Sequence, residues 1–165
     1  PDDEKKASDA LIKAGCDVLA QHCDTTAPQE ASENNGTWAI GYNSDMSKET
    51  PKATLTSVIW NWSAYYTSYI SSIINASYSG ENYYGGMKES LVSLTELSSL
   101  CDDQTAEKVK EAKEKIVSGD FGVFDGVLKT NTGDSIGEEG KTLDDAKITG
   151  EINWYYHNVS ELKWK

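Results

Sequence analysis

The chain has 165 residues, of which 38% are hydrophobic and 25% charged, as expected for a soluble globular protein with one sizeable core. Its formal net charge is -12 at pH 7, and its lysines are scattered among acidic residues, so no basic stripe is present that could bind nucleic acid through the phosphate backbone. No run comes near the roughly 20 apolar residues that a membrane-spanning helix requires.

The first 60 residues predict alternating helices and strands. Alanine and leucine recur at helical spacing before Gly15, a residue type that favours a helix end, and Pro28 lies where a first helical turn tolerates proline. Short apolar runs bounded by Gly, Asn, Asp or Pro are typical of buried strands. The expected elements are a helix over 3–14, a strand over Cys16–Gln21, a helix from Thr26 to about Asn34, and strands over Trp38–Tyr42 and Ala53–Ile59. This order is typical of a parallel sheet with right-handed crossovers.

A wide apolar stripe marks the next helix, which starts at Trp62 and ends before Gly80. Its members fall at i, i+3, i+4, i+7, i+8, i+11 and i+12: Trp62, Tyr65, Tyr66, Tyr69, Ile70, Ile73 and Ile74. Tyrosines at such spacing are more typical of core packing than of a cofactor site. We therefore expect Tyr65, Tyr66 and Tyr69 to pack in the core.

The remaining residues predict shorter elements. We expect strands or extended segments at Tyr83–Met87 and Leu91–Leu94, a helix that begins with Asp102 and Asp103 and ends at Gly119, and a strand over Phe121–Lys129. A surface loop over Ser135–Lys141 and a helix from Thr142 to Gly150 should follow. The tail Ile152–Val159 holds three aromatic residues, too many to stay in water unless it docks on another part of the protein.

Polar and aromatic residues follow three of the predicted strands directly. They are His22, Cys23 and Asp24 after the first strand, Asn43, Ser44 and Asp45 after the second, and Trp60, Asn61 and Trp62 after the third. In open α/β sheets, ligands bind outside the carboxyl ends of the strands. If the loops after these strands converge, they form one wall of a recognition cleft.

The two tryptophans have two interpretations that spacing alone leaves open. At positions i and i+2, Trp60 and Trp62 face different ways, so one packs inward while the other stands free at the sheet edge, or both belong to the core. A free indole beside Asn and Asp suits a flat ligand with polar edges, because stacking supplies contact energy and hydrogen bonds supply orientation.

The His22-Cys23-Asp24 sequence also contains the parts of a nucleophilic catalytic site. Adjacent residues at a strand end point to opposite faces, however, which disfavours a hydrogen bond between His22 and Cys23. The three cysteines, at 16, 23 and 101, have no metal-like spacing and are interpreted as free thiols. No phosphate-binding glycine loop occurs either, so neither a metal nor a cofactor is expected.

Four segments in this order resemble the basic membrane protein family of substrate-binding lipoproteins, which serve ABC importers of nucleosides and related purines. The segments are CDVLAQHCDTTAP, WAIGYNSDMS, PKATLTSVIWNW and YYGGMKESLVSL. The resemblance runs over nearly the whole chain. It implies one α/β domain over residues 1–165, the second lobe of a two-lobed type I periplasmic-binding fold, with a mostly parallel sheet flanked by helices. The resemblance also implies that this sequence corresponds to a part of the family's chain without the N-terminal lobe, the hinge and the lipid-attached cysteine.

The resemblance also implies where a ligand would bind. The family's Gly-Val-Asp-x-Asp-Gln motif falls on Gly41–Met46, so its first acid is replaced by Asn43 and its second is kept as Asp45. The family's Thr-Ser-Val-x-Lys motif falls on Thr56–Trp60, so the lysine on the sugar side of the ligand is a tryptophan here. This exchange removes a hydroxyl-directed donor and adds an aromatic plane. We therefore expect a purine base, with a nucleoside as the second choice.

The implied function is extracytoplasmic capture of that ligand and its delivery to an ABC permease, without covalent chemistry. Lipid anchoring would hold only the full-length protein at the membrane. The expected ligand-binding residues are His22, Cys23, Asp24, Asn43, Asp45, Trp60 and Trp62. Three alternatives stay open: a carbohydrate-binding module that uses the exposed tryptophans, an enzyme that uses Cys23 and His22, and a folded lobe without ligand affinity.

Overall fold

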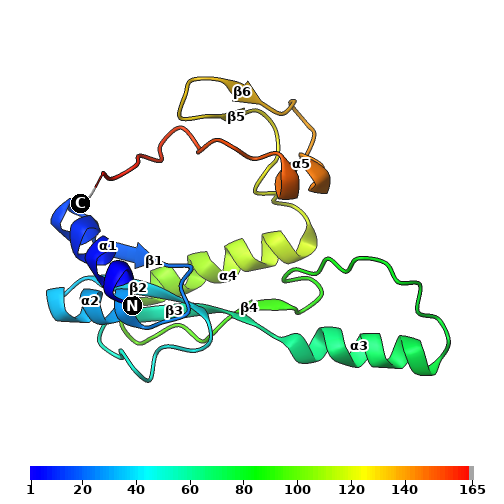
Figure 1. The fold of residues 1–165 in the computed structure, drawn as a ribbon, viewed down its shortest axis with the longest axis horizontal. Coiled ribbons are helices and arrows are strands. Elements are labelled where there is room, and N and C mark those ends of the chain that lie inside the picture. The colour runs from blue at the N-terminus through cyan, green and yellow to red at the C-terminus, as the bar shows by residue number, and fades with distance from the viewer. Residues whose placement is uncertain (164–165) are drawn as a thin grey trace. The chain divides into compact units, whose positions relative to one another are not determined.

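A computed structural model of the chain describes residues 1–163 (Figure 1). The chain divides into two compact units, Pro1–Lys113 and Glu114–Lys163. The first unit contains a four-stranded sheet and the second contains a two-stranded sheet. Among the described residues, no helix is both long and apolar enough to span a bilayer.

The sheet of the first unit is mostly parallel. Its strands are β1 (Val18–Ala20), β2 (Trp38–Asn43), β3 (Thr54–Trp60) and β4 (Val92–Leu94), in that spatial order. The first three strands run parallel to their neighbours, with Ala20 opposite Ile40 and Asn43 opposite Ile59. Only β4 runs antiparallel, with Val92 opposite Trp60. The predicted α/β fold with a mostly parallel sheet is thereby confirmed, although the expected strand Cys16–Gln21 shortens to β1.

The first two predicted helices are present in the first unit, and one of them packs against the sheet. Helix α2 (Ala27–Asn35) packs against β1 and β2, and helix α1 (Asp2–Lys13) packs against α2. Helix α2 has proline in its first turn and ends at Gly36, whose φ of 69° is one that glycine adopts without strain.

The core between these layers is made of small residues and hydroxyls. Its apolar part includes Leu19, Ala31 and Ala39, and its buried polar part consists mainly of serines and threonines. The hydroxyls of Thr50 and Thr54 lie 2.7 Å apart and satisfy each other. Such small side chains allow the sheet and α2 to approach closely.

Helix α3 (Trp62–Ile74) corrects the expectation that its tyrosines pack in the core. None of its residues is buried, and Tyr66 and Ile70 are each 54% exposed. Tyr65 and Tyr69 are half-buried, and their rings contact those of Tyr83 and Tyr78, which belong to the following loop. The apolar stripe therefore exists, but it does not face the sheet.

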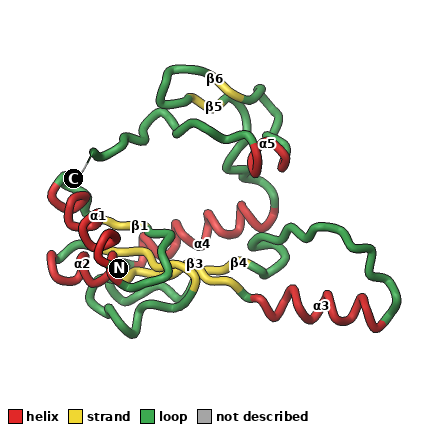
Figure 2. The backbone as a smooth tube through the Cα atoms, in the orientation of Figure 1, coloured by secondary structure: helices red, strands yellow, loops and turns green. Residues whose placement is uncertain are grey.

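The physical reason lies in how the chain leaves and re-enters the sheet. The backbone N–H of Asn61 donates to the carbonyl of Leu91 at 2.7 Å, so the segment between them begins and ends at adjacent points beside β3 and β4. The helix α3 extends outward from that point, and an irregular loop returns from it (Figure 2). The expected extended segment Tyr83–Met87 forms no strand, because the Gly86 N–H bonds to the Glu89 carboxylate and closes a turn.

Helix α4 (Asp103–Ser118) begins in the first unit and ends in the second. Asp102 caps it by accepting a hydrogen bond from the Thr105 N–H at 2.7 Å. Hydrogen bonding by Thr105, first through its side chain and then through its backbone, lowers the pKa of Asp102. Gly119 follows the helix with a φ of 84°. Both predicted helix ends are thus confirmed.

The second unit contains β5 (Leu128–Lys129), β6 (Ser135–Ile136) and α5 (Asp145–Gly150). The predicted strand Phe121–Lys129 was too long, since turns and bends interrupted by glycines occupy its first part and only two residues pair with β6. The first two residues of the predicted loop Ser135–Lys141 form β6 itself. Helix α5 starts later than expected, because Asp144 caps it by accepting from the Lys147 N–H.

The aromatic tail docks on this hairpin through its backbone, as expected, although Tyr155 and Tyr156 stay 49% and 43% exposed. The Asn131 N–H donates to the Tyr155 carbonyl at 2.8 Å, and the His157 N–H donates to the Lys129 carbonyl at 2.9 Å. Trp154 is half-buried and shares a small pocket with Ile136 and Leu143.

Candidate ligand-binding site

The carboxyl ends of β1, β2 and β3 lie at one edge of the sheet, because the three strands are parallel and adjacent. The loops at residues 22–24, 43–45 and 60–62 all start from that edge. Side-chain contacts join them there: the rings of His22 and Tyr42 have centroids 4.2 Å apart, and Tyr42 meets Trp60 edge-on at 6.4 Å. The convergence expected from strand order is therefore present.

These contacts form an aromatic row of His22, Tyr42, Trp60 and Trp62 across the three strand exits. Tyr42, the central member, is absent from the residues that the sequence singles out. It lies inside β2, one residue before Asn43. The alternation of side chains along the strand did not indicate that its ring would lie outside the core. Its half-buried ring links the histidine to the tryptophans.

The two tryptophans stack on each other, with centroids 5.6 Å apart and an interplanar angle of 23°. The expectation that they face different ways is wrong, and so is the alternative that both belong to the core, because Trp62 is 50% exposed. The reason is that β3 ends at Trp60. The next residue, Asn61, has a φ of -99° and a ψ of 75° and turns the chain into α3. Strand alternation does not extend through that turn.

An open pocket of about 410 Å³ lies beside the stacked indoles. Its lining is mostly aromatic: Trp60, Trp62, Tyr65, Tyr83, Tyr84, Gly85 and Leu91. This volume falls in the range of small-molecule sites. The polar residues after β1 and β2 do not line it, so the pocket offers stacking surface while hydrogen-bonding groups lie at the other end of the aromatic row.

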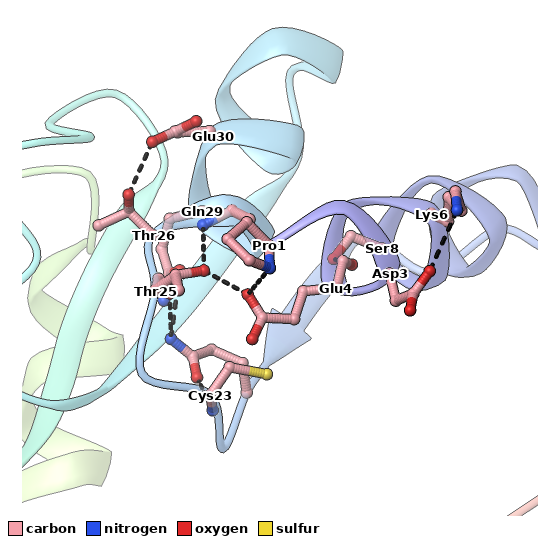
Figure 3. A network of polar contacts seen from close by, with 12 residues as sticks. Pro1, Asp3, Glu4, Lys6, Ser8, Cys23, Thr25, Thr26, Gln29 and Glu30 are labelled. Carbon is pink, nitrogen blue, oxygen red and sulfur yellow. Dashed lines mark hydrogen bonds and ion pairs between the residues drawn. The ribbon is translucent and has the colours of Figure 1, made fainter.

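Hydrogen bonds to side chains of α1 and α2 hold the loop after β1 in place. The Cys23 N–H donates to the side-chain oxygen of Gln21, and the Thr25 hydroxyl donates to the Glu4 carboxylate (Figure 3). His22 and Asp24 are exposed, whereas Cys23 is a half-buried free thiol. No hydrogen bond joins His22 to Cys23 in the part of the chain that the structure describes.

The loop after β2 presents one polar residue with an unusual backbone and one acid with a local partner. Asn43 has a φ of 71°, a left-handed conformation that asparagine tolerates better than most residues. Asp45 accepts hydrogen bonds from the Ser47 hydroxyl at 2.6 Å and from the Ser47 N–H at 3.0 Å. These bonds hold the pKa of Asp45 below its ordinary value, so the side chain is a carboxylate near neutral pH.

Within residues 1–163, no group of three or more His, Cys, Asp and Glu side chains is placed to hold a metal ion. The chemistry available at the sheet edge is therefore stacking on four rings together with hydrogen bonding through an imidazole, amides and carboxylates.

The model of the Bmp family, described as PnrA-like ABC transporter substrate-binding proteins, matches residues 1–125. The chain belongs to this family. The match covers both the sheet and the loops at its edge, and it confirms the resemblance carried by the four sequence segments.

Two relatives place this PnrA-like chain among solute-binding proteins. A purine-binding protein of Brucella abortus is 32% identical over 161 residues, which are 98% of this chain and 45% of that protein. A protein of Haloferax volcanii, named as a candidate ABC transporter glucose-binding protein, is 30% identical over 126 residues, 76% of this chain and 32% of that protein. The PnrA-like chain thus spans less than half the length of these relatives.

Solved structures share the fold of the PnrA-like chain. A transcriptional activator of the comK gene from Bacillus halodurans aligns with a TM-score of 0.61 at 24% identity, over 67% of this chain and 40% of that one. An ABC transporter solute-binding protein from Aeropyrum pernix aligns with a TM-score of 0.55 at 16% identity, over 71% of this chain and 42% of that one. A second such protein, from Conexibacter woesei, has a TM-score of 0.54 at 18% identity, over 73% and 41%.

Proposed function

We propose that this chain is the ligand-binding lobe of an extracytoplasmic solute-binding protein that delivers a purine base to an ABC permease. The observation that carries the proposal is the aromatic row at the sheet edge, flanked by Asn43, Asp45 and Asp24. Aromatic planes bind the faces of a heterocycle, and carboxylates and amides bind its N–H groups and ring nitrogens. The name of the Brucella relative supports a purine.

In this proposal, the stacked indoles supply contact area and the loops after β1 and β2 supply orientation. His22 and Asp24 meet the ligand from one side and Asn43 and Asp45 from the other, while Cys23 contacts it through its backbone or thiol. No covalent step is involved. The absence of a lysine at position 60 favours a base over a nucleoside.

The proposal also includes a second lobe that closes over the ligand. A closing cleft normally buries most of a small ligand, and a single wall buries less of it. The exposed apolar stripe of α3 supports this part of the proposal, because such a stripe requires cover in a stable protein. We therefore expect weak binding by the isolated chain, and we propose lipid anchoring of the full-length protein outside the cytoplasm.

A sugar is the second candidate ligand. The name of the Haloferax relative supports it, and exposed indoles also serve carbohydrate faces. A sugar has no flat aromatic edge, however, so the carboxylates after β1 and β2 would face hydroxyl groups rather than ring nitrogens.

Calorimetry on the full-length protein separates these candidates. Adenine, hypoxanthine, adenosine and glucose are titrated into the wild type and into Trp60→Ala, with Trp38→Ala as a matched control. Trp38 is a partly exposed tryptophan at the opposite end of β2. Loss of base stacking costs about 1–3 kcal/mol, so we expect Trp60→Ala to weaken purine binding by roughly 5- to 150-fold. Heat from glucose together with silence from every purine would overturn the proposal.

A further inference from the structure

Gln21, the residue that follows β1 directly, contacts three separate segments through one side-chain amide. Its oxygen accepts from the Cys23 N–H in the loop after β1. Its Nε2 lies 3.3 Å from Oε1 of Gln29 on α2 and 3.3 Å from the sulfur of Met46, the residue after Asp45. It also lies 3.4 Å from the Thr25 carbonyl. One amide thus links two of the three loops at the candidate site.

The orientation of the Gln21 amide is determined by two backbone groups, the Ile40 carbonyl, which can only accept a hydrogen bond, and the Cys23 N–H, which can only donate one. The carbonyl of Ile40 in β2 can only accept, so Gln29 turns its Nε2 toward it, at 3.4 Å. The Oε1 of Gln29 then faces Gln21 and requires a donor, which is Nε2 of Gln21. The oxygen of Gln21 is left for the Cys23 N–H, which can only donate. Every member of the chain of bonds has the polarity that its neighbours need.

Burial makes this arrangement costly to break. Gln29 is 0% exposed, so an unpaired polar atom there would lack water as an alternative partner. Met46 is buried as well, and its N–H is held by the Ser57 hydroxyl at 3.2 Å. The anchor points behind Gln21 are therefore rigid, whereas the side chains in front of it, His22 and Asp24, are exposed. Figure 3 shows Cys23 and Thr25 in the loop after β1, beside Glu4 of α1.

We propose that Gln21 is a positioning residue, which couples the loop at 22–24 to the loop at 43–46 and holds both in the geometry that binds ligand. The inference rests on the proposed function for its effect on affinity. The coupling of the two loops itself does not depend on the identity of the ligand.

The variant Gln21→Glu tests the proposal with almost no change of shape. A carboxylate keeps the acceptor for the Cys23 N–H but cannot donate to Gln29, Thr25 or Met46. Gln104→Glu, on the exposed start of α4, is the matched control for the change of charge. We expect Gln21→Glu to weaken adenine binding by the full-length protein about tenfold. Gln104→Glu should remain within about twofold of the wild type.

A pH series separates positioning from a general loss of structure. A glutamate has an ordinary pKa of about 4.3 and regains one O–H donor when it is protonated. The ratio of adenine affinities between Gln21→Glu and the wild type should therefore approach one as the pH falls from 7.5 toward about 4. His22, Asp24, Asp45 and Glu4 are present in both proteins, so the ratio cancels their contributions. A ratio that stays constant with pH, accompanied by a lower urea midpoint, would show a merely structural role and overturn the proposal.

Hydrogen exchange provides a measurement that needs no ligand. In Gln21→Glu at pH 7.5, we expect the backbone amides of residues 43–46 to exchange faster than in the wild type, although the substitution lies in the other loop. Unchanged exchange there overturns the coupling even if purines bind. If the wild type binds no purine, the proposed function fails, and this exchange measurement still decides whether the loops are coupled.

Discussion

Gly41, near the end of β2, shows how a single residue sets the position of a whole loop. A Cβ atom at this position would collide with the Ser57 hydroxyl and would lie only 3.3 Å from Cβ of Met46. The same hydroxyl accepts the Met46 N–H and so holds the loop that contains Asn43 and Asp45. Glycine is needed here for close approach between strands rather than for its backbone freedom.

Gly41→Ala should destabilise the protein by about 1–3 kcal/mol, because the added methyl overpacks a rigid contact. Urea unfolding monitored by far-UV circular dichroism measures this loss. Ser57→Ala removes the colliding oxygen, so the double variant should lose less than the sum of the two single variants. Strict additivity would contradict the contact.

Asp45 should titrate below the ordinary aspartate range, because its two hydrogen bonds from Ser47 favour the carboxylate. A lowered pKa in the folded state means that these bonds stabilise the turn fully above about pH 4 and that this contribution is lost as the pH falls through the lowered pKa. NMR titration of the Ser47 amide should therefore give a midpoint below about 3.9. Asp45→Asn should lack the transition, and a midpoint above the ordinary value would refute the assignment.

At the scale of elements, the sequence predicted the positions of the helices better than it predicted which helices are buried. The spacing of apolar residues correctly placed α1, α4 and the start of α3, but α3 ends at Ile74 and not at Gly80 as predicted. Pro28 and Thr26 correctly placed α2, and short apolar runs correctly placed β2 and β3. Burial of α3 was predicted wrongly, because periodicity reports that one face is apolar and does not report what covers it. The strands after residue 80 were overextended because Gly85, Gly122 and Gly126 interrupt runs that otherwise have strand composition.

The exposure of α3 gives an element-scale prediction. Ile70→Ser should change the unfolding free energy of this chain by at most about 0.5 kcal/mol, because the side chain is already 54% exposed. Leu19→Ala, at a core position that is 4% exposed, should cost about 2–5 kcal/mol. In the full-length protein with the proposed second lobe, Ile70→Ser should become destabilising. Equal effects of Ile70→Ser in both proteins would argue that the second lobe leaves α3 uncovered.

At the scale of the whole molecule, negative charge dominates. The chain has 27 acidic and 15 basic residues, and the ion pairs found within residues 1–163 are largely solvent-exposed, such as Lys5 with Asp9 and Lys141 with Glu138. Exposed pairs contribute little to stability, whereas the repulsion among like charges acts on the compact state as a whole.

Added NaCl should therefore raise the melting temperature. Between about 0.01 M and 1 M salt, the screening length falls from about 30 Å to about 3 Å, which removes most of the repulsion between acids on the surface. Differential scanning calorimetry measures the shift. A variant with Glu107→Gln and Glu111→Gln, two exposed acids of α4, should show a smaller dependence on salt. A melting temperature that falls with salt would mean that attractive pairs outweigh the repulsion.

The candidate site was predictable only in part, and for a reason that applies to the molecule as a whole. Strand order places the loops after β1, β2 and β3 at one edge, and this followed from the sequence. The roles of Tyr42 and Gln21 did not, because both lie in or beside strands where polar and aromatic residues have ordinary structural uses. Only the contacts between strands distinguish them.

The stacked indoles have one more consequence. Trp60 belongs to the sheet and Trp62 to the outward helix, and Asn61 is the single residue between them. The two indoles have centroids 5.6 Å apart, so we expect their excited states to couple and to give an exciton couplet in the circular dichroism spectrum. Any rotation of α3 about Asn61 would change the distance and the angle between the two rings. The circular dichroism signal of the indole pair would therefore report that motion.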